Sequence, residues 1–262
     1  MAEETLISLF HEMVAKKGDQ TALRDKDLGI WRPVSWNQFN QRVKNFLFGL
    51  ECLGLKEKDK VAILADPCPE WVYAELAVQT ARAIVVGVYP TSPPAQIHYL
   101  LEHSGSRFII VEDQEQVDKV LEIKDRLPGL ERIIYIDPKG LRHYDDPMLI
   151  EFEKVDALGR EAGLADPDRY EGLVQAVKAD DVAMLIYTSG TTGHPKAAMI
   201  THRNIVAMVE AMVEVTGVDD QDSVVSYLPL CHIAEQIFSV FIQLKVGATC
   251  NFSESIETVN EN

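Results

Sequence analysis

The amino-acid sequence predicts an α/β fold in which parallel sheets are flanked by helices. Between residues 61 and 136, short apolar runs without polar alternation are separated by single stretches of helical periodicity. Strands buried on both faces of a helix-covered parallel sheet have this pattern. A segment rich in Gly, Ser and Thr, residues 187–196, also lies between two apolar runs. Because ligands of such sheets bind beyond the carboxyl ends of the strands, this segment is a candidate binding loop.

The first 54 residues predict two helices around a short pair of strands. Apolar residues at helical spacing favour a helix over 5–16, and the runs 22–24 and 31–34 favour strands. Ser35 and Gln38 have the spacing of a capping box, which predicts the start of the second helix.

The alternation that follows predicts the main sheet. Its elements are strands over 61–64, 84–88, 108–111 and 133–136, with helices over 70–81, 94–102 and 114–126 between them. Right-handed crossovers are expected between the parallel strands.

Residues 137–181 interrupt this alternation. They contain twelve acidic and six basic residues, and one helix is predicted near 148–158. The charge excess favours a solvated excursion on the surface. We therefore expect a first α/β layer over residues 1–178 and the start of a second layer over 179–262.

The second layer is predicted to begin with two strands joined by the Gly/Ser/Thr segment. The expected elements are strands over 182–186 and 197–200, a helix from the N-cap Thr201 to residue 215, a strand over 223–228, a helix over 232–244 and a strand over 249–252.

The chemistry of the joining segment favours binding of a polyphosphate. Hydroxyl and backbone N–H groups donate to phosphate oxygens, glycine permits close approach of the backbone, and a lysine supplies charge. The residues concerned are Thr188, Ser189, Gly190, Thr191, Thr192, Gly193 and Lys196. The spacing is not that of a Walker loop, because Gly190 and Gly193 are three apart and Pro195 precedes the lysine. An ordinary turn ending in a surface lysine remains the alternative.

His232 is the second candidate site residue, because it follows a predicted strand and begins a helix. Glu235, three residues on, is expected either to orient the imidazole or to lie in solvent. Tyr187 is interpreted as an anchor of the loop. His202 and Arg203 are expected to be solvated in the first turn of their helix. The apolar face of the 232–244 helix could line a tunnel or simply be buried.

Composition limits the class of protein. The formal net charge of −16 argues against a nucleic-acid partner, since phosphate backbones require a basic face. The four cysteines form no Cys-x-x-Cys pair, which favours reduced thiols in a cytoplasmic protein. Residues 1–10 do not have the pattern of a signal peptide, and no run of about 18 apolar residues predicts a membrane span. Peripheral contact with the inner membrane face stays open, as does the oligomeric state.

Four segments together resemble the AMP-binding, adenylate-forming enzymes. The segment Tyr-Thr-Ser-Gly-Thr-Thr-Gly-His-Pro-Lys at 187–196 resembles the signature loop of that superfamily. Three others resemble blocks of its members: Asp-Pro-Cys-Pro-Glu-Trp at 66–71, Gly-Val-Tyr-Pro-Thr-Ser at 87–92 and Leu-Pro-Leu-Cys-His-Ile-Ala-Glu at 228–235. The last two point to bacterial-type long-chain fatty acyl-CoA synthetases, and to the N-terminal part of their large domain.

The resemblance implies a two-step reaction. A fatty acid carboxylate attacks the α-phosphate of ATP to give acyl-adenylate and pyrophosphate, and the thiol of coenzyme A then displaces AMP. It implies that the residues of the loop bind the ATP phosphates together with Mg²⁺, and that Lys196 either balances their charge or anchors the loop. It also implies that His232 lies beside the acyl carboxylate. Such chemistry depends on positioning and charge neutralisation.

The resemblance also implies segments that the 262 residues lack, among them a Tyr-Gly-x-Thr-Glu block. We therefore expect an N-terminal fragment that does not catalyse adenylation by itself. Two alternatives remain open for the function. One is an acyl-acyl-carrier-protein ligase or another adenylate-forming enzyme, and the other is a non-catalytic nucleotide-binding domain.

Overall fold

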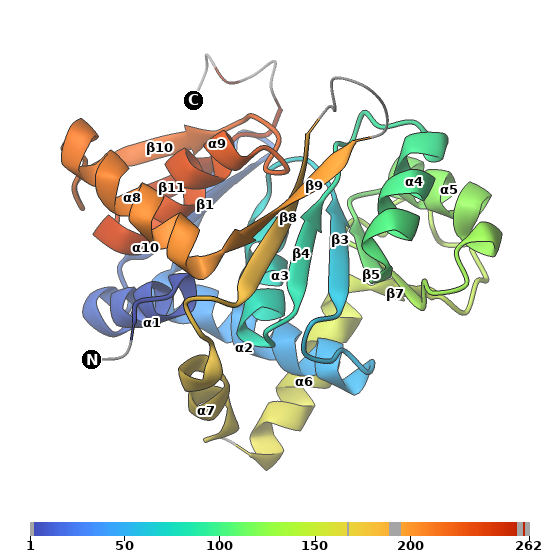
Figure 1. Cartoon of the computed structure of the whole chain (residues 1–262), viewed down its shortest axis with the longest axis horizontal. Coiled ribbons are helices and arrows are strands. Elements are labelled where there is room, and N and C mark those ends of the chain that lie inside the picture. The colour runs from blue at the N-terminus through green and yellow to red at the C-terminus, as the bar shows by residue number, and fades with distance from the viewer. Residues whose placement is uncertain (1–2, 167, 189–194, 256–258, 260–262) are drawn as a thin grey trace.

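A computed structural model of the chain describes residues 3–166, 168–188, 195–255 and 259 (Figure 1). Its main feature is a seven-stranded sheet with the order β7-β6-β5-β3-β4-β8-β9. The strands are β3 (Lys60–Leu64), β4 (Ile84–Gly87), β5 (Ser106–Val111), β6 (Arg132–Tyr135), β7 (Leu149–Glu151), β8 (Val182–Thr188) and β9 (Lys196–Thr201). All neighbouring pairs are parallel except β8 and β9, which are antiparallel. The predicted parallel sheet is confirmed.

Both faces of this sheet are buried, which explains why its strands lack polar alternation. Along β3, Val61 and Ile63 belong to one apolar core, whereas Ala62 and Leu64 belong to the other. The first core is covered by α2 (Trp36–Cys52), α3 (Pro69–Thr80), α6 (Phe152–Ala165) and α7 (Arg169–Ala176). The second is covered by α4 (Pro94–Ser104) and α5 (Gln114–Ile123), which continues into a short 3-10 turn, η1 (Lys124–Arg126). Figure 1 shows α4 and α5 on the side of the sheet opposite to α2, α3 and α6.

A second, four-stranded sheet has the order β10-β11-β1-β2. Its strands are β1 (Thr21–Asp27), β2 (Ile30–Ser35), β10 (Ser223–Ser226) and β11 (Thr249–Phe252). The helices α1 (Leu6–Lys17) and α8 (His202–Thr216) contribute to the same core as this sheet. The expected capping box of Ser35 and Gln38 is present at the start of α2, and Thr201 caps α8 as expected.

The two sheets do not follow the expected division of the chain at residue 179. The N-terminal β1 pairs with β11, and β8 pairs with β4 of the main sheet. Each sheet therefore contains strands from both sides of 179, and the assignment of 1–178 and 179–262 as separate layers stays a prediction.

The segment 137–181 is more than a solvated excursion, and that interpretation needs correction. It supplies the edge strand β7 and two helices, α6 and α7, of which α6 starts later than the helix expected near 148–158. Helix α6 crosses α2 at backbone contact, and Asp156 is buried there beside Arg42 at 3.2 Å. The charge excess misled the interpretation because part of it forms ion pairs at a helix–helix contact.

The helix expected over 232–244 is interrupted in the structure. It consists of α9 (Ile233–Glu235), a π-helical stretch η2 (Gln236–Phe241) and α10 (Ile242–Val246). A π-turn is rare and occurs often at functional sites. Phe241 is fully buried in the core, which agrees with the buried-helix interpretation, and Ile233 lies at the wall of a pocket. No helix in the described part of the chain has the length and apolar character needed to span a bilayer.

Candidate functional site

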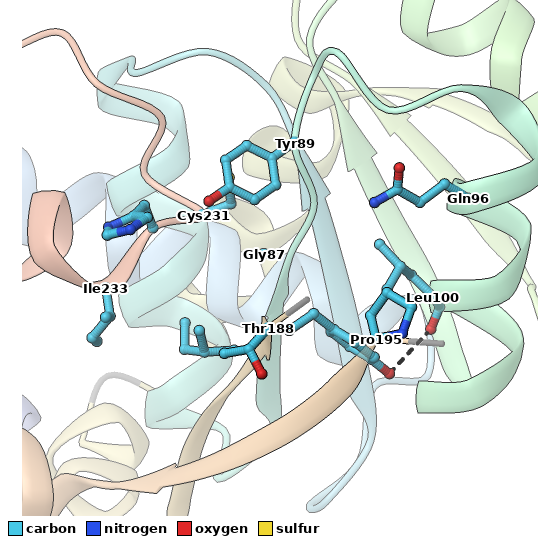
Figure 2. A pocket seen from close by; sticks show the side chains of 11 residues that line it. Gly87, Tyr89, Gln96, Leu100, Thr188, Pro195, Cys231 and Ile233 are labelled. Carbon is cyan, nitrogen blue, oxygen red and sulfur yellow. Dashed lines mark hydrogen bonds between the residues drawn. The ribbon is translucent and has the colours of Figure 1, made fainter. Parts of the chain in front are cut away.

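A pocket of about 390 Å³ lies where β4 and β8 end. Its walls come from four parts of the chain (Figure 2). They are the end of β4 with the residues after it, helix α4, the end of β8 with the residue before β9, and the start of α9 with the turn before it. The lining residues are Gly87, Tyr89, Gln96, Leu100, Ile186, Tyr187, Thr188, Pro195, Cys231, His232 and Ile233. The pocket therefore lies at the carboxyl edge of parallel strands, as expected for a ligand site in this type of sheet.

The two strand ends that flank the candidate loop meet at this pocket. Thr188 is the last residue of β8 and pairs in register with Lys196, the first residue of β9. Both are exposed, and no ion pair joins Lys196 to any residue that the structure describes. The positions of Ser189, Gly190, Thr191, Thr192 and Gly193 lie outside the described residues, so their predicted contacts with phosphate stay predictions.

His232 is exposed and lines the pocket, as the N-cap residue of α9. The Ala234 backbone N–H donates to its Nδ1 at 3.2 Å. In the neutral ring the proton therefore resides on Nε2, since Nδ1 acts as acceptor. The Nε2–H group is consequently free to donate a hydrogen bond to a carboxylate in the pocket. The catalytic role of His232 stays a prediction.

Glu235 does not orient this imidazole, nor does it lie in solvent, so both expectations were wrong. It is buried, and its Oε1 accepts hydrogen bonds from the hydroxyls of Ser226 at 2.8 Å and Ser239 at 2.7 Å. Glu235 thus ties the end of β10 to η2. A carboxylate with such partners stabilises the turn that carries His232 instead of polarising the ring.

Gly87, Tyr89 and Cys231 form the inner wall, and sequence reasoning gave them no role in the site. A methyl group on Gly87 would lie 2.8 Å from the Cys231 Cα, so only glycine allows this close approach. Burial raises the pKa of the Cys231 thiol to about 12. Cys231 is therefore a protonated packing group. One sequence signal could have identified this wall. Residues 87–92 and 228–235 lie at or just after the carboxyl ends of strands, where ligand sites of such sheets are found.

Tyr187 has the anchoring position that was expected of it. Its hydroxyl lies 2.8 Å from His103 Nδ1 and 3.5 Å from the Leu100 carbonyl oxygen, both on α4. Pro195, the residue before β9, is held by the same helix, because the Tyr99 hydroxyl donates to the Pro195 carbonyl at 2.9 Å. Sequence reasoning missed Tyr99 and His103, which lie 84 or more residues away along the chain.

His202 is buried, which corrects the expectation that it is solvated. Burial lowers the pKa of its imidazole to about 4, against the opposing effect of Asp181, so the ring is neutral at pH 7. Arg203 is on the surface as expected, where it pairs with Glu3 at 2.6 Å and Asp180 at 2.8 Å. Neither residue lines the pocket.

Magnesium was expected with the nucleotide. Among the described residues, no group of three or more His, Cys, Asp and Glu side chains is arranged to hold a metal ion. These side chains therefore do not provide a site that fits the ion, and its participation stays a prediction.

Taken together, these observations define an α/β protein with a pocket at the carboxyl edge of its main sheet. The sequence matches the family described as AMP-binding enzyme over residues 10–261. The chain belongs to this family, and the resemblance of its sequence motifs to that superfamily is confirmed.

Curated relatives share about a third of the residues. The chain is 33% identical over 256 residues to the long-chain-fatty-acid–CoA ligase ACSBG2 of Xenopus laevis, with 95% of the chain and 34% of that protein covered. It is 33% identical over 260 residues to the long-chain-fatty-acid–CoA ligase heimdall of Drosophila melanogaster, with 96% and 38% covered. The chain thus spans little more than a third of the length of these relatives.

Solved structures share the fold. The crystal structure of the anthranilate CoA ligase AuaEII in complex with anthranoyl-AMP has a TM-score of 0.81 at 20% identity, covering 100% of this chain and 47% of that one. A long-chain-fatty-acid–CoA ligase, FadD1 from Archaeoglobus fulgidus, has a TM-score of 0.80 at 19% identity, covering 96% and 47%. The expected α/β fold of an adenylate-forming enzyme is confirmed.

Proposed function

We propose that the intact protein is an AMP-forming long-chain fatty acid–CoA ligase. The observation that carries the proposal is the family match over residues 10–261 together with relatives that bear this name. The pocket supports it, because Thr188, Pro195 and His232 converge there from different parts of the chain.

The first step would join the fatty acid to the nucleotide. A carboxylate oxygen forms a bond to the α-phosphorus of ATP, the bond from that phosphorus to the bridging oxygen breaks, and pyrophosphate leaves. Lys196 would offset negative charge on the phosphates, and Thr188 would donate its hydroxyl to a phosphate oxygen. His232 would donate Nε2–H to the carboxylate and so orient it for attack.

The second step would transfer the acyl group to coenzyme A. The thiol sulfur bonds to the acyl carbon, the thiol proton is lost, and AMP leaves with the electron pair of the broken C–O bond. Ile186 and Ile233 offer apolar surface beside the pocket for an acyl chain. This is in keeping with a fatty acid as substrate.

The proposal is tested by assaying the intact protein with ATP, Mg²⁺ and long-chain fatty acids. We expect pyrophosphate release that depends on the fatty acid, and acyl-CoA as product. Lys196→Ala should raise the KM for ATP about tenfold, the effect of losing one charged hydrogen bond. Lys139→Ala, another exposed lysine away from the pocket lining, is the matched control. Product formation with a carrier protein but not with coenzyme A would favour the alternative ligase, and ATP binding without any turnover would favour a non-catalytic domain.

His232 provides a sharper test of the site. We expect His232→Ala to lower kcat/KM for the fatty acid about tenfold, because the carboxylate loses its donor. His232→Gln should recover part of this loss, since the glutamine side-chain nitrogen can occupy a position near Nε2. Steady-state kinetics at saturating ATP measure both variants. An alanine variant as active as the unmodified protein would show that His232 has no role in the reaction.

A further inference from the structure

We propose that Tyr99 and His103 of α4 are positioning residues for the nucleotide. They would act by holding the two strand ends that carry Thr188 and Lys196 at a fixed place over the pocket. The inference rests on the proposed function, in which these two residues meet the phosphates of ATP.

The first reason is that strand pairing alone leaves β9 weakly held. β9 is the last strand of the main sheet, so among the described residues only β8 pairs with it. Its backbone pairing ends at the pair of Thr188 and Lys196. The hydrogen bond of 2.9 Å from the Tyr99 hydroxyl to the Pro195 carbonyl is a tie to this edge strand from outside the sheet.

The second reason is that the same helix also holds the opposite strand end. One turn further along α4, His103 Nδ1 lies 2.8 Å from the Tyr187 hydroxyl. The hydroxyl lies in turn 3.5 Å from the Leu100 carbonyl. Both contacts are satisfied when Nδ1–H donates to the hydroxyl and the hydroxyl donates to the carbonyl oxygen. These hydrogen bonds fix the orientation of the Tyr187 side chain, and they thereby help to fix the position of the adjacent Thr188.

The third reason is that the two ties are themselves coupled. The rings of Tyr99 and His103 are stacked with centroids 5.4 Å apart, and the rings of His103 and Tyr187 meet edge-on at 5.7 Å. Helix α4 has its own apolar anchor, because Ile97, Leu100 and Leu101 are buried in the second core. The ties thus connect both strand ends to a rigid element, which is how a site gains a fixed geometry.

Packing alone would not require the hydroxyl of Tyr99 or the ring nitrogen of His103. His103 is exposed, so no burial demands that its ring nitrogen find a partner. A phenylalanine at 99 and a leucine at 103 would supply apolar contact equally well. The hydrogen bonds instead determine where the strand ends lie.

The test measures ATP binding to the intact protein by calorimetry, with fatty acid binding and thermal unfolding as parallel readouts. Tyr99→Phe keeps the ring and removes only the hydrogen bond to the Pro195 carbonyl. We expect it to weaken ATP binding about fivefold. Fatty acid binding and the unfolding temperature should not change. His103→Leu should have a similar effect, and His103→Asn should restore much of the affinity because its amide nitrogen lies near the position of Nδ1.

Tyr144→Phe is the matched control, because it removes a hydroxyl that bonds Asp118 outside the pocket. ATP affinities of Tyr99→Phe and His103→Leu equal to that of this control would overturn the inference. If acyl-CoA is formed while these affinities are unchanged, the inference fails alone. If the protein binds ATP but activates no fatty acid, the proposed function fails while the Tyr99→Phe affinity still decides the inference. Absence of ATP binding would overturn both.

Discussion

Replacing Glu75 with glutamine is expected to stabilise the protein by an amount that increases with pH. Glu75 lies on α3 and is fully buried. Gln79 Nε2 donates to its Oε1 at 3.2 Å, whereas Oε2 has no hydrogen-bond partner of good geometry. Gln236 and Trp71 also face the carboxyl, and no cation in the described part of the chain contributes to the shift of its pKa. Burial is the main cause that raises the pKa of Glu75 to about 8.

The direction of the effect follows from proton linkage. Because the folded state holds this proton more tightly than the unfolded state, the stabilisation is complete below the unfolded pKa and is lost as pH rises through the folded one. Each pH unit between these values removes about 1.4 kcal/mol. The advantage of Glu75→Gln over the unmodified protein should therefore grow by about 3 kcal/mol between pH 5 and pH 8.

Denaturant unfolding of the intact protein at several pH values measures this difference. Glu214→Gln makes the same charge change on the exposed face of α8 and serves as the control. A Glu75→Gln curve parallel to that of the unmodified protein across this range would show that Glu75 does not retain its proton.

Gly159→Ala is expected to destabilise the protein by about 3 kcal/mol, or to prevent its folding. Gly159 lies at the crossing of α6 and α2, where a methyl group would be 1.7 Å from the Asn45 carbonyl oxygen. On the facing helix, a methyl group on Gly49 would be 2.0 Å from the Val155 carbonyl oxygen. The obstacles are backbone atoms, which cannot rotate away as a flexible side chain would. The two helices would have to separate.

Gly172→Ala provides the contrast on α7. A methyl group there meets nothing within 4 Å. Because alanine favours helix over glycine, this variant should be more stable by up to about 1 kcal/mol. Thermal unfolding of both variants tests the pair. If Gly159→Ala unfolds at the same temperature as Gly172→Ala, α2 and α6 do not approach as closely as described.

Much of the fold was accessible from local sequence patterns. The apolar runs over 61–64 and 108–111 predicted strands of a parallel sheet, and Ser35 with Gln38 predicted the start of α2. The segment 187–196 predicted a loop between two strands, and β8 and β9 flank it. These features are local, because a strand period, a cap or a turn is determined by residues a few positions apart.

The candidate site was accessible only in part. His232 and Lys196 were identified from motifs, and both lie at the pocket or at its edge. Glu235 was misjudged, because its sequence position could not reveal that Ser226 and Ser239 would surround its carboxylate. The interrupted helix after His232 was also missed, since apolar spacing does not distinguish a π-turn from an α-helix.

By itself, the sequence determined the α/β class, the order of most helices and strands, and the family to which the chain belongs. Tertiary structure alone decided that β1 lies beside β11, that Gly87 contacts Cys231, and that α4 holds the ends of β8 and β9. The physical reason is range. Periodicity and capping arise from neighbours along the chain, whereas a pocket wall forms where distant segments meet in the packed core, and nothing in the local pattern specifies that meeting.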